Sequence, residues 1–473
     1  MNRTGEELLK KIKQTEDEKQ ASVQKSPYRA AFHLMPPVGW LNDPNGLCQF
    51  EGVYHLFFQY APFDVDGGMK AWGHYTSRDM ISLQYEGAPF VPDESYDKDG
   101  VYSGSAWTED GKMYLYYTGN VKEAGEHDYI HSGRGANVVF VSSEDGLHFS
   151  EKKLLLTNAD YPENCTNHVR DPKIYKENGK YYMVLGARLD GGEGEDRGAI
   201  LLYSSENLTE FIYEKTETTD TPFGYMWECP DVFCLDGKRV LSISPQGVEA
   251  EEYRYQNIYQ SGYFSGNVPY DTEKFTEWDM GFDFYAPQTF EDESGRRILV
   301  AWAGVPDAEY KSRMPGDEWQ HMMTIPRELR RKDDKVLQYP VKELEKYRGE
   351  KASVSAGEKI SLPEFQMDIL LEEKENEKIT GNVFIGSECV LECKEDEISL
   401  SFTGRSGAGR TIRRAKTEGV RKLRILIDVS IVEIFVNDGE LSFTTRIFSE
   451  EKDRFVKPDV KADFIAYYPI RMK

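Results

Sequence analysis

Cysteine is scarce in this chain, with 6 in 473 residues, and no two of them form a Cys-x-x-Cys pair. So few cysteines exclude a disulfide-rich scaffold. No apolar run approaches the roughly 18–20 residues that span a bilayer. Basic residues are outnumbered by acidic ones, 58 against 82, which gives a formal net charge of −24. Because such a charge repels phosphate backbones and anionic lipids, we expect neither a nucleic acid nor a membrane surface as partner.

The amino-terminal segment lacks the marks of a secretory signal. Its first 25 residues are charged throughout and contain neither an apolar core nor a small-residue cleavage site. A cytoplasmic location is therefore expected. Leu8, Leu9 and Ile12 are spaced as on one face of a helix, which predicts a helical extension over residues 1–26.

Aromatic residues are abundant, at 13% with 29 Tyr and 24 Phe, a bias that suits β-sheets and sugar-stacking surfaces. A degenerate repeat accompanies them. A turn dipeptide ending in glycine precedes an apolar, aromatic-rich strand five times, at intervals of between 58 and 68 residues. Such dipeptides are typical of β-hairpins, because the turn needs positive φ. The five turn glycines are Gly52, Gly111, Gly179, Gly237 and Gly295.

A period near 60 residues holds about four short strands with their loops, which is one blade of a β-propeller. The repeat therefore predicts an all-β protein with a five-bladed β-propeller over residues 27–345. The alternative is five unrelated hairpins, and the regular spacing disfavours it. No long amphipathic helical pattern interrupts the run, which argues against an α/β barrel.

The character of the chain changes beyond Pro340. Residues 341–348 predict a short linker helix. Closely spaced strand patterns follow, including 423–428 and 431–436, and a hairpin turn at 437–439. This pattern predicts a carboxyl-terminal β-sandwich over residues 346–473.

The repeat also locates candidate chemistry. Counting back eight or nine residues from three of the turn glycines reaches Asp43, Asp171 and Glu228, on what we expect to be the inner strands. Inner strands of a propeller converge on its axis, so these side chains should face one central pocket. Two carboxyl groups across a sugar, one ionised and one protonated, are what glycoside hydrolysis requires. A third carboxylate nearby would help one of them to keep its proton.

The boxes around these acids resemble those of glycoside hydrolase family 32, the β-fructofuranosidases. The resemblance covers nearly the whole chain after residue 27, and the boxes come in the family's order. The boxes that carry it are Trp40-Leu41-Asn42-Asp43-Pro44-Asn45-Gly46, Phe58-Gln59-Tyr60, Trp72-Gly73-His74, Tyr102-Ser103-Gly104-Ser105-Ala106, Arg170-Asp171-Pro172, Glu228-Cys229-Pro230 and Phe284-Tyr285-Ala286-Pro287-Gln288.

The resemblance implies a role for each acid. Asp43 would be the nucleophile that forms a fructosyl-enzyme intermediate, and Glu228 the general acid and then base. Asp171 would hold two sugar hydroxyls and stabilise the transition state, with Arg170 orienting the carboxylates. Retention of configuration follows from double displacement. The substrate-binding residues would be Trp40, Asn42, Gln59, Trp72, Tyr102, Ser103, Arg170 and Trp302.

No cofactor and no metal are expected. His127 and His131 are four residues apart, but the sequence shows no third ligand beside them, so they are interpreted as an exposed loop pair.

The expected substrate is a terminal β-D-fructofuranoside, sucrose 6-phosphate or sucrose. A phosphate would need a local basic site, for which Arg188, Arg197, Arg254 and Arg313 are candidates, although the interpretation as a solvated surface charge is favoured for each of them. Three alternatives remain open: a fructan exo-hydrolase, a fructosyltransferase, and a non-catalytic fructan-binding protein, which would be expected to lose a carboxylate. An inverting propeller glycosidase would separate its carboxyl groups more widely. The sequence leaves monomer and homodimer equally open.

Overall fold

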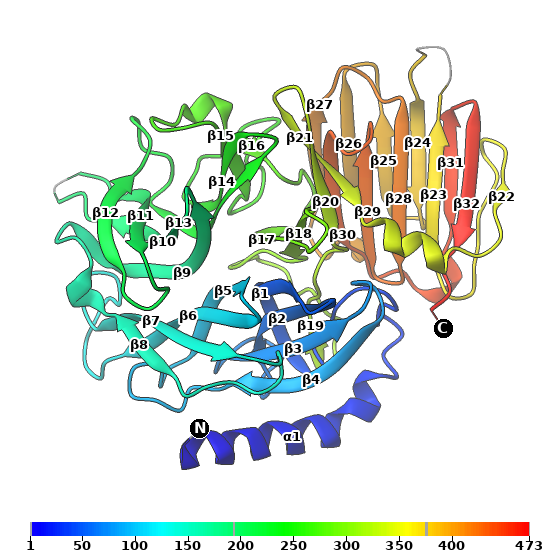
Figure 1. Ribbon diagram of the computed structural model, residues 1–473. Coiled ribbons are helices and arrows are strands. Elements are labelled where there is room, and N and C mark those ends of the chain that lie inside the picture. The colour runs from blue at the N-terminus through cyan, green and yellow to red at the C-terminus, as the bar shows by residue number, and fades with distance from the viewer. Residues whose placement is uncertain (1, 193, 374–376, 473) are drawn as a thin grey trace.

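The computed structural model describes residues 2–192, 194–373 and 377–472. Apart from one long helix and short 3-10 turns, these residues form strands in seven sheets. Five sheets make up the body on the left and bottom of Figure 1, and two make up the body on the right. The predicted architecture, a β-propeller followed by a β-sandwich, is confirmed. The domain boundaries at 26/27 and 345/346 stay a prediction.

The predicted amino-terminal helix is present as α1 (Arg3–Val23), capped by the side chain of Asn2. Its buried residues include Ile12, and Glu16 accepts hydrogen bonds from the hydroxyls of Tyr60 (2.9 Å) and Tyr85 (2.6 Å). These contacts hold α1 along the outside of the first sheet (Figure 1). Within the described ranges, no helix is long and apolar enough to cross a membrane.

The five sheets of the propeller follow one another along the chain. Their strand orders and bounds are β19-β1-β2-β3-β4 (Trp319–Gln320, Gly39–Phe50, Val53–Ala61, Ala71–Ser77, Leu83–Phe90), β5-β6-β7-β8 (Val101–Glu109, Lys112–Lys122, Arg134–Ser143, Lys153–Leu156), β12-β11-β10-β9 (Ile212–Glu217, Arg197–Ser205, Lys180–Leu189, Cys165–Glu177), β13-β14-β15-β16 (Met226–Leu235, Lys238–Gln246, Gly262–Ser265, Thr276–Glu277) and β17-β18-β20-β21 (Tyr285–Glu291, Arg297–Trp302, Arg327–Lys332, Lys335–Pro340).

The first strands of the five sheets form a closed ring. β1 contacts β5, β5 contacts β9, β9 contacts β13, β13 contacts β17, and β17 contacts β1 again. The short strand β19, from the fifth unit, pairs in parallel with β1 and so ties the last sheet to the first. A cavity of about 650 Å³ is lined by residues of all five inner strands, which shows that they surround one axis.

Each turn predicted by the repeat joins an inner strand to the next strand of its sheet. At four of them both turn residues have positive φ, for example Asp110 (50°) and Gly111 (71°). This is the conformation that favours glycine and acidic or amide residues and matches the twist of a hairpin. At the fifth turn only Gly295 has positive φ (80°). The turn dipeptide predicted the hairpins reliably because the turn conformation itself requires positive φ at those residues.

The second body is a two-layered sandwich, shown in yellow to red in Figure 1. Its apolar core includes Ile369, Leu391, Ile425 and Phe443, none of which is exposed. The two sheets are β22-β32-β23-β28-β29-β30 (Ala352–Ser353, Phe464–Pro469, Gln366–Glu372, Lys422–Asp428, Ile431–Val436, Leu441–Arg446) and β27-β26-β25-β24-β31 (Ile412–Lys416, Glu397–Phe402, Cys389–Cys393, Thr380–Ile385, Val456–Lys461).

Short 3-10 helices connect several strands. The segment Lys342–Tyr347 is one of them, so the predicted linker helix between the two bodies is present in 3-10 form. The others in the described ranges are Asn158–Asp160, Thr272–Lys274, Arg405–Gly407 and Glu451–Asp453.

A buried network of charges joins the sandwich to the propeller. His33 bonds Asp428 through Nδ1 (2.8 Å) and Glu433 through Nε2 (3.0 Å). Arg327 donates to Glu433 through Nη2 (2.5 Å) and to Asp279 through Nη1 (3.1 Å). The side chains of Arg327, Glu433 and Asp428 have no accessible surface. The two bodies are therefore fastened by paired charges as well as by apolar contact.

Candidate active site

A β-bulge interrupts each inner strand at the same level along the axis. In every case two residues of the inner strand face one residue of its partner, because the pairing slips between two ladder positions. Bulges bend a strand and redirect its side chains. They also remove the need for a ladder donor, which is why proline is tolerated there. The bulged pairs are Asn42-Asp43, Tyr102-Ser103, Asp171-Pro172, Cys229-Pro230 and Ala286-Pro287.

The three predicted acids occupy different positions relative to these bulges. Asp43 is the second residue of its bulge, Asp171 is the first, and Glu228 immediately precedes its own. The residues that precede the bulges of the other four inner strands are Leu41, Val101, Arg170 and Tyr285, and the last two bond to Glu228. The similar spacing of the three acids from the turn glycines thus predicted the correct strands and the correct level along the axis. The prediction that the acids occupy equivalent positions on those strands was wrong.

Backbone strain marks the same places. Asp171 (φ 65°), Cys229 (46°) and Ala286 (50°) all lie in the left-handed region, which non-glycine residues seldom adopt. Such strain persists only where the surrounding structure enforces it, and it is concentrated at functional sites.

The Asp43 carboxylate is held by short polar side chains. Ser103 donates to its Oδ2 (2.5 Å), and Asn42 donates to its Oδ1 (3.1 Å). Gln59 in turn donates to Ser103 (2.8 Å) and accepts from Asn42 (3.2 Å). The four side chains form a closed network that fixes the carboxylate in one orientation.

Asp171 lies beside the backbone of the acid-bearing strand. Its Oδ2 accepts from the backbone N–H of Cys229 (2.8 Å), and its own N–H donates to Thr118 (2.9 Å). The thiol of Cys229 also reaches Oδ2 of Asp43, at 3.7 Å. Cys229 therefore touches both aspartates and directly follows Glu228, which places the three carboxylates in one site.

Two acids contact Arg170, and Glu228 is more accessible to solvent than Asp171. Its side chain is 16% exposed, against 3% for Asp171. Arg170 donates to its Oε1 through Nη2 (2.7 Å), while Tyr285 (2.6 Å) and Gln246 (2.7 Å) donate to Oε2. Its accessibility places Glu228 at the outer edge of the site.

Burial and mutual repulsion control protonation in this cluster. Burial raises the pKa of Asp171 to about 7, and the charges of Glu228 and Asp43 act in the same direction against Arg170. Burial also raises the pKa of Asp43, although the hydrogen bonds from Ser103 and Asn42 oppose it. Burial and the neighbouring negative charges therefore favour the protonated forms of the two aspartates in this cluster.

The predicted substrate-binding residues divide into two groups. Trp40, Asn42, Gln59, Ser103 and Arg170 bond to the carboxylates or to one another, with Trp40 donating to Asn42 Oδ1 (2.9 Å). They lie in the site. Their contact with a sugar stays a prediction.

Trp72, Tyr102 and Trp302 make up the second group. Trp72 has no accessible surface, and its indole N–H donates to the carbonyl of Tyr102 (3.0 Å). It therefore supports β5, the strand that carries Ser103, from the side away from the carboxylates. Direct sugar contact by Trp72 is not favoured by this position. Trp302 is buried edge-on to Trp40 with its N–H unpartnered within the described ranges, which leaves that donor available to a ligand.

Sequence reasoning missed three residues of the site. Gln246 could have been found, since it follows the turn Gly237 by as many residues as Glu228 precedes it. Tyr285 stood in a recognised box without an assigned role. Lys70 gave no signal; it donates to Asn42 (2.9 Å), and burial lowers its pKa to about 8 against the charge of Asp43.

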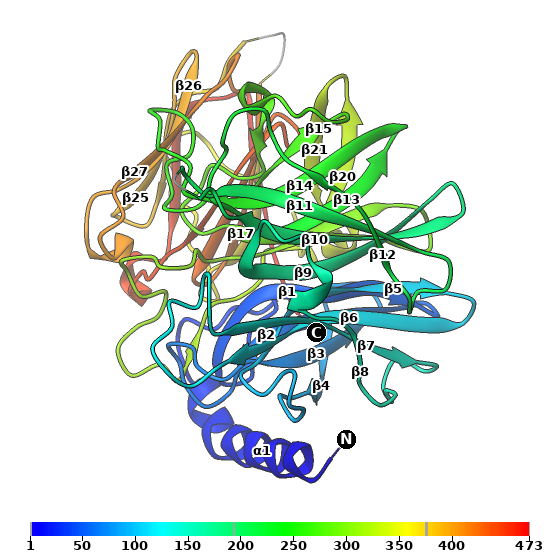
Figure 2. The same ribbon diagram turned by 90° about the vertical axis from the view of Figure 1, so that its left-hand side faces the viewer.

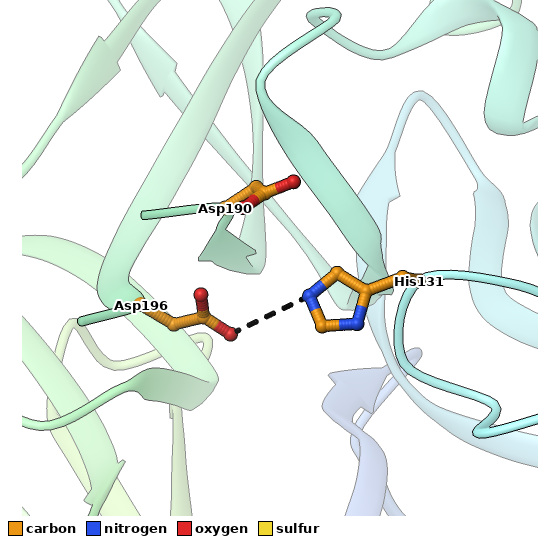
Figure 3. A group of neighbouring side chains, drawn as sticks. All are labelled: His131, Asp190 and Asp196. Carbon is orange, nitrogen blue, oxygen red and sulfur yellow. Dashed lines mark ion pairs between the residues drawn. The ribbon is translucent and has the colours of Figure 1, made fainter. Parts of the chain in front are cut away.

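The histidine pair of the 127–131 loop gained partners that the sequence did not reveal. The fold brings Asp190 and Asp196 to His131, with ligand atoms within 4.8 Å of one another (Figure 3). Asp196 already pairs with Arg188 (2.5 Å) and His131 with Asp128 (2.9 Å). These competing bonds make the group an exposed ion-pair network, and His127 has no part in the triad.

Comparison with known proteins agrees with this geometry. Residues 33–340 match the model of the glycosyl hydrolases family 32 N-terminal domain, and residues 394–461 match the family's C-terminal domain. A sucrose-6-phosphate hydrolase of Bacillus subtilis is 39% identical over 468 residues, which are 95% of each chain.

Solved structures show the same likeness. A sucrose-6-phosphate hydrolase from Lactobacillus gasseri superposes with a TM-score of 0.85 at 28% identity, covering 97% of this chain and 96% of that one. A mutant Bombyx mori β-fructofuranosidase in complex with sucrose gives 0.82 at 28% identity, covering 100% and 99%. Together with the three carboxylates on neighbouring inner strands, these matches establish that the chain belongs to glycoside hydrolase family 32.

Proposed function

We propose that this chain is a retaining β-fructofuranosidase that hydrolyses sucrose 6-phosphate, by way of a covalent fructosyl-enzyme intermediate. Family membership and the Bacillus subtilis relative support the activity and the substrate. The observation that carries the mechanism is the link through Cys229, which contacts both Asp43 and Asp171 and adjoins Glu228.

In the first step, an Asp43 oxygen attacks the anomeric carbon of the fructosyl unit. Ser103 and Asn42 fix the attacking carboxylate, which lowers the cost of reaching the reactive geometry. Glu228 gives its proton to the bridging oxygen as the bond to the leaving sugar breaks. Asp171 binds sugar hydroxyls and stabilises the positive charge that develops on the fructosyl ring.

In the second step, Glu228, now ionised, takes a proton from water. The resulting hydroxide attacks the same carbon, displaces Asp43 and restores the original configuration. Glu228 must alternate between two protonation states, and its partners suit both. The Tyr285 hydroxyl can donate or accept, while Arg170 holds Oε1 throughout.

A fructan exo-hydrolase and a fructosyltransferase remain alternatives with the same intermediate, because water, a sugar acceptor and different leaving groups compete at one site. A non-catalytic role is disfavoured, since all three carboxylates are present and held in place.

We further propose a cytoplasmic location and a small sugar as the partner. All six cysteines are free thiols, as expected in a reducing compartment, and a sugar phosphate is a substrate found inside cells. Monomer and homodimer both stay open.

The test is a comparison of turnover on sucrose 6-phosphate, sucrose and a short fructan, with the first-formed fructose anomer followed by NMR. We expect sucrose 6-phosphate to have the highest kcat/KM and β-fructofuranose to appear first. A preference for the fructan would favour the exo-hydrolase, and accumulation of fructosylated acceptors the transferase. An α-anomer first would exclude double displacement.

A further inference from the structure

Three arginines lie around one half-buried histidine, His168, at the outer edge of the site. Arg134 begins β7, Arg170 lies on β9 and Arg188 lies near the end of β10. Burial, together with the charges of these three guanidinium groups, lowers the pKa of His168 to about 3. His168 is therefore neutral, with Nε2 donating to the Tyr129 carbonyl (3.0 Å) and Nδ1 accepting from Arg170 (3.1 Å).

Two of the three arginines have carboxylate partners. Arg170 pairs with Glu228 (2.7 Å), and Arg188 pairs with Asp196 (2.5 Å). Arg134 forms no ion pair with any residue in the described ranges, and its Nε is buried without a hydrogen-bond partner. Burial lowers the pKa of Arg134, and the neighbouring Arg170 charge lowers it further. The residue is half-buried, so its guanidinium is a partly desolvated cation without a counter-charge, which an anionic ligand would supply.

The position of Arg134 is fixed before any ligand arrives. Its backbone pairs with Lys122 of β6, and its carbonyl accepts from the side chain of Asn158 (2.9 Å). Asn158 also bonds Asn167 (3.1 Å), which precedes His168 on β9. The segment carrying Arg134 is thus tied to the strand that bears Arg170 and Asp171, so its backbone needs little ordering on binding.

Arg134 lies on the side of the site where the leaving sugar must go. Asn158 and Asn167 link the Arg134 carbonyl to the segment of His168. His168 accepts from Arg170, which holds Glu228, the acid that protonates the departing oxygen. The charges of Arg170 and Glu228 also act on Arg134. The fructosyl unit lies between Asp43 and Asp171 in the proposed reaction, which leaves the Glu228 side for the other sugar.

We propose that Arg134, assisted by Arg188, forms the subsite that binds a phosphate monoester on the leaving sugar. This inference rests on the proposed function and specifies how that site would select its substrate. A guanidinium presents its donors in a fork that matches two phosphate oxygens, and such charge-assisted bonds are among the strongest in proteins.

Arg188 is suited to assist. Asp196 holds its Nε, and its guanidinium lies over the ring of Tyr225, with 4.7 Å from Cζ to the ring centroid. Of the group drawn in Figure 3, Asp196 is the residue that holds Arg188, and His131 lies 3.9 Å from the same Asp196 oxygen. The other three arginines suggested by the sequence are engaged elsewhere: Arg197 with the Thr219 and Asp220 carbonyls, Arg254 with Tyr255 and the Phe275 carbonyl, and Arg313 with Asp66.

The test is Arg134→Gln, with kcat/KM measured on sucrose 6-phosphate and on sucrose in the same preparation. The readout is the ratio of the two values. We expect the ratio to fall roughly 10- to 100-fold, the range of one lost hydrogen bond to a charged group, and mostly through KM. Arg134→Lys keeps the charge without the fork and should give an intermediate ratio. Arg330→Gln, on the outer strand β20, removes an exposed arginine paired with Glu328 and should leave the ratio unchanged.

A second measurement separates this inference from the proposed function. Glucose 6-phosphate and glucose are compared as ligands by calorimetry, with wild type and Arg134→Gln, and this needs no turnover. The subsite requires that the phosphate group strengthen binding in wild type and that the substitution abolish most of that gain. Equal affinities for the two ligands, or an unchanged ratio of kcat/KM in Arg134→Gln, would overturn the subsite while leaving fructosidase activity intact. Absence of turnover on every fructoside would instead overturn the proposed function.

Discussion

The axial site and the contact between propeller and sandwich both bury clusters of charged side chains. At the contact, Arg327 lies between Asp279 and Glu433. His33 bridges Asp428 and the same Glu433, which is therefore shared between the two cations. Backbone donors complete the set: the N–H groups of Ala31 and Ile325 bond Asp428 and Glu433. Each of these charges has its partners within the chain.

The axial site is paired less completely. Three carboxylates meet two cations, Arg170 and Lys70, and burial raises the pKa of both Asp43 and Asp171. Arg134 stands at the edge without a carboxylate. Buried charge by itself therefore says little about function. A charge cluster that is saturated fastens the fold, and one left incomplete is prepared for a proton or a ligand.

The largest effect is expected at the incomplete cluster. Glu228→Gln keeps the size of the side chain and removes the transferable proton, so kcat should fall by at least about 10³-fold on a substrate with a poor leaving group. The Glu228→Gln variant should still unfold cooperatively, and it should lose less stability than the Glu433→Gln variant described next. Initial rates and denaturant unfolding check this. Glu291→Gln, an exposed glutamate paired with Arg297, is the control, and near-normal turnover in Glu228→Gln would refute its role as acid.

The saturated cluster should respond in the opposite way. Glu433→Gln leaves Arg327 and His33 each with one carboxylate in a fully buried place, which we expect to cost about 3–5 kcal/mol of unfolding free energy. The kcat of the folded protein should stay close to wild type. Glu440→Gln is the matched control, because its pairing with Lys332 is a surface contact worth about 0–1 kcal/mol. Equal stability losses in the two variants would erase the distinction drawn here.

A smaller effect is expected from pH. Burial would lower the pKa of His33, but its hydrogen bonds to Asp428 and Glu433 raise it to about 9. Since the folded pKa lies above the ordinary value of about 6.5, the protonated ring stabilises the fold fully below about pH 6.5. That contribution, at most about 3 kcal/mol, is lost as pH rises towards 9. His33→Gln should be less stable and lack this pH dependence. Unfolding midpoints at pH 6, 7.5 and 9 measure it, and a flat wild-type profile would contradict the assignment.

Much of the architecture could be predicted because its signals are local. A hairpin turn demands positive φ from its own residues, so five glycines gave the sheets and their spacing. The acids could be found because they lie a short, fixed distance from those turns. Gln246 could be found in the same way, because it lies as far after Gly237 as Glu228 lies before it, on the other strand of the same hairpin.

The remaining features depend on segments far apart in the chain. The sequence does not distinguish Arg134 from Arg188 or Arg330. Only the packing of the chain leaves Arg134 without a carboxylate partner. Asp428 and Glu433 lie in a strand pattern of the sandwich, yet their partners include His33, some 400 residues earlier. By itself, then, the sequence determined the repeating hairpins, the two kinds of β-sheet body and which three carboxylates lie beside the bulges of the inner strands, since these follow from backbone conformation and short spacings. The tertiary structure alone decided which charges are saturated and which are left open, because pairing between distant side chains depends on how the sheets close into a ring.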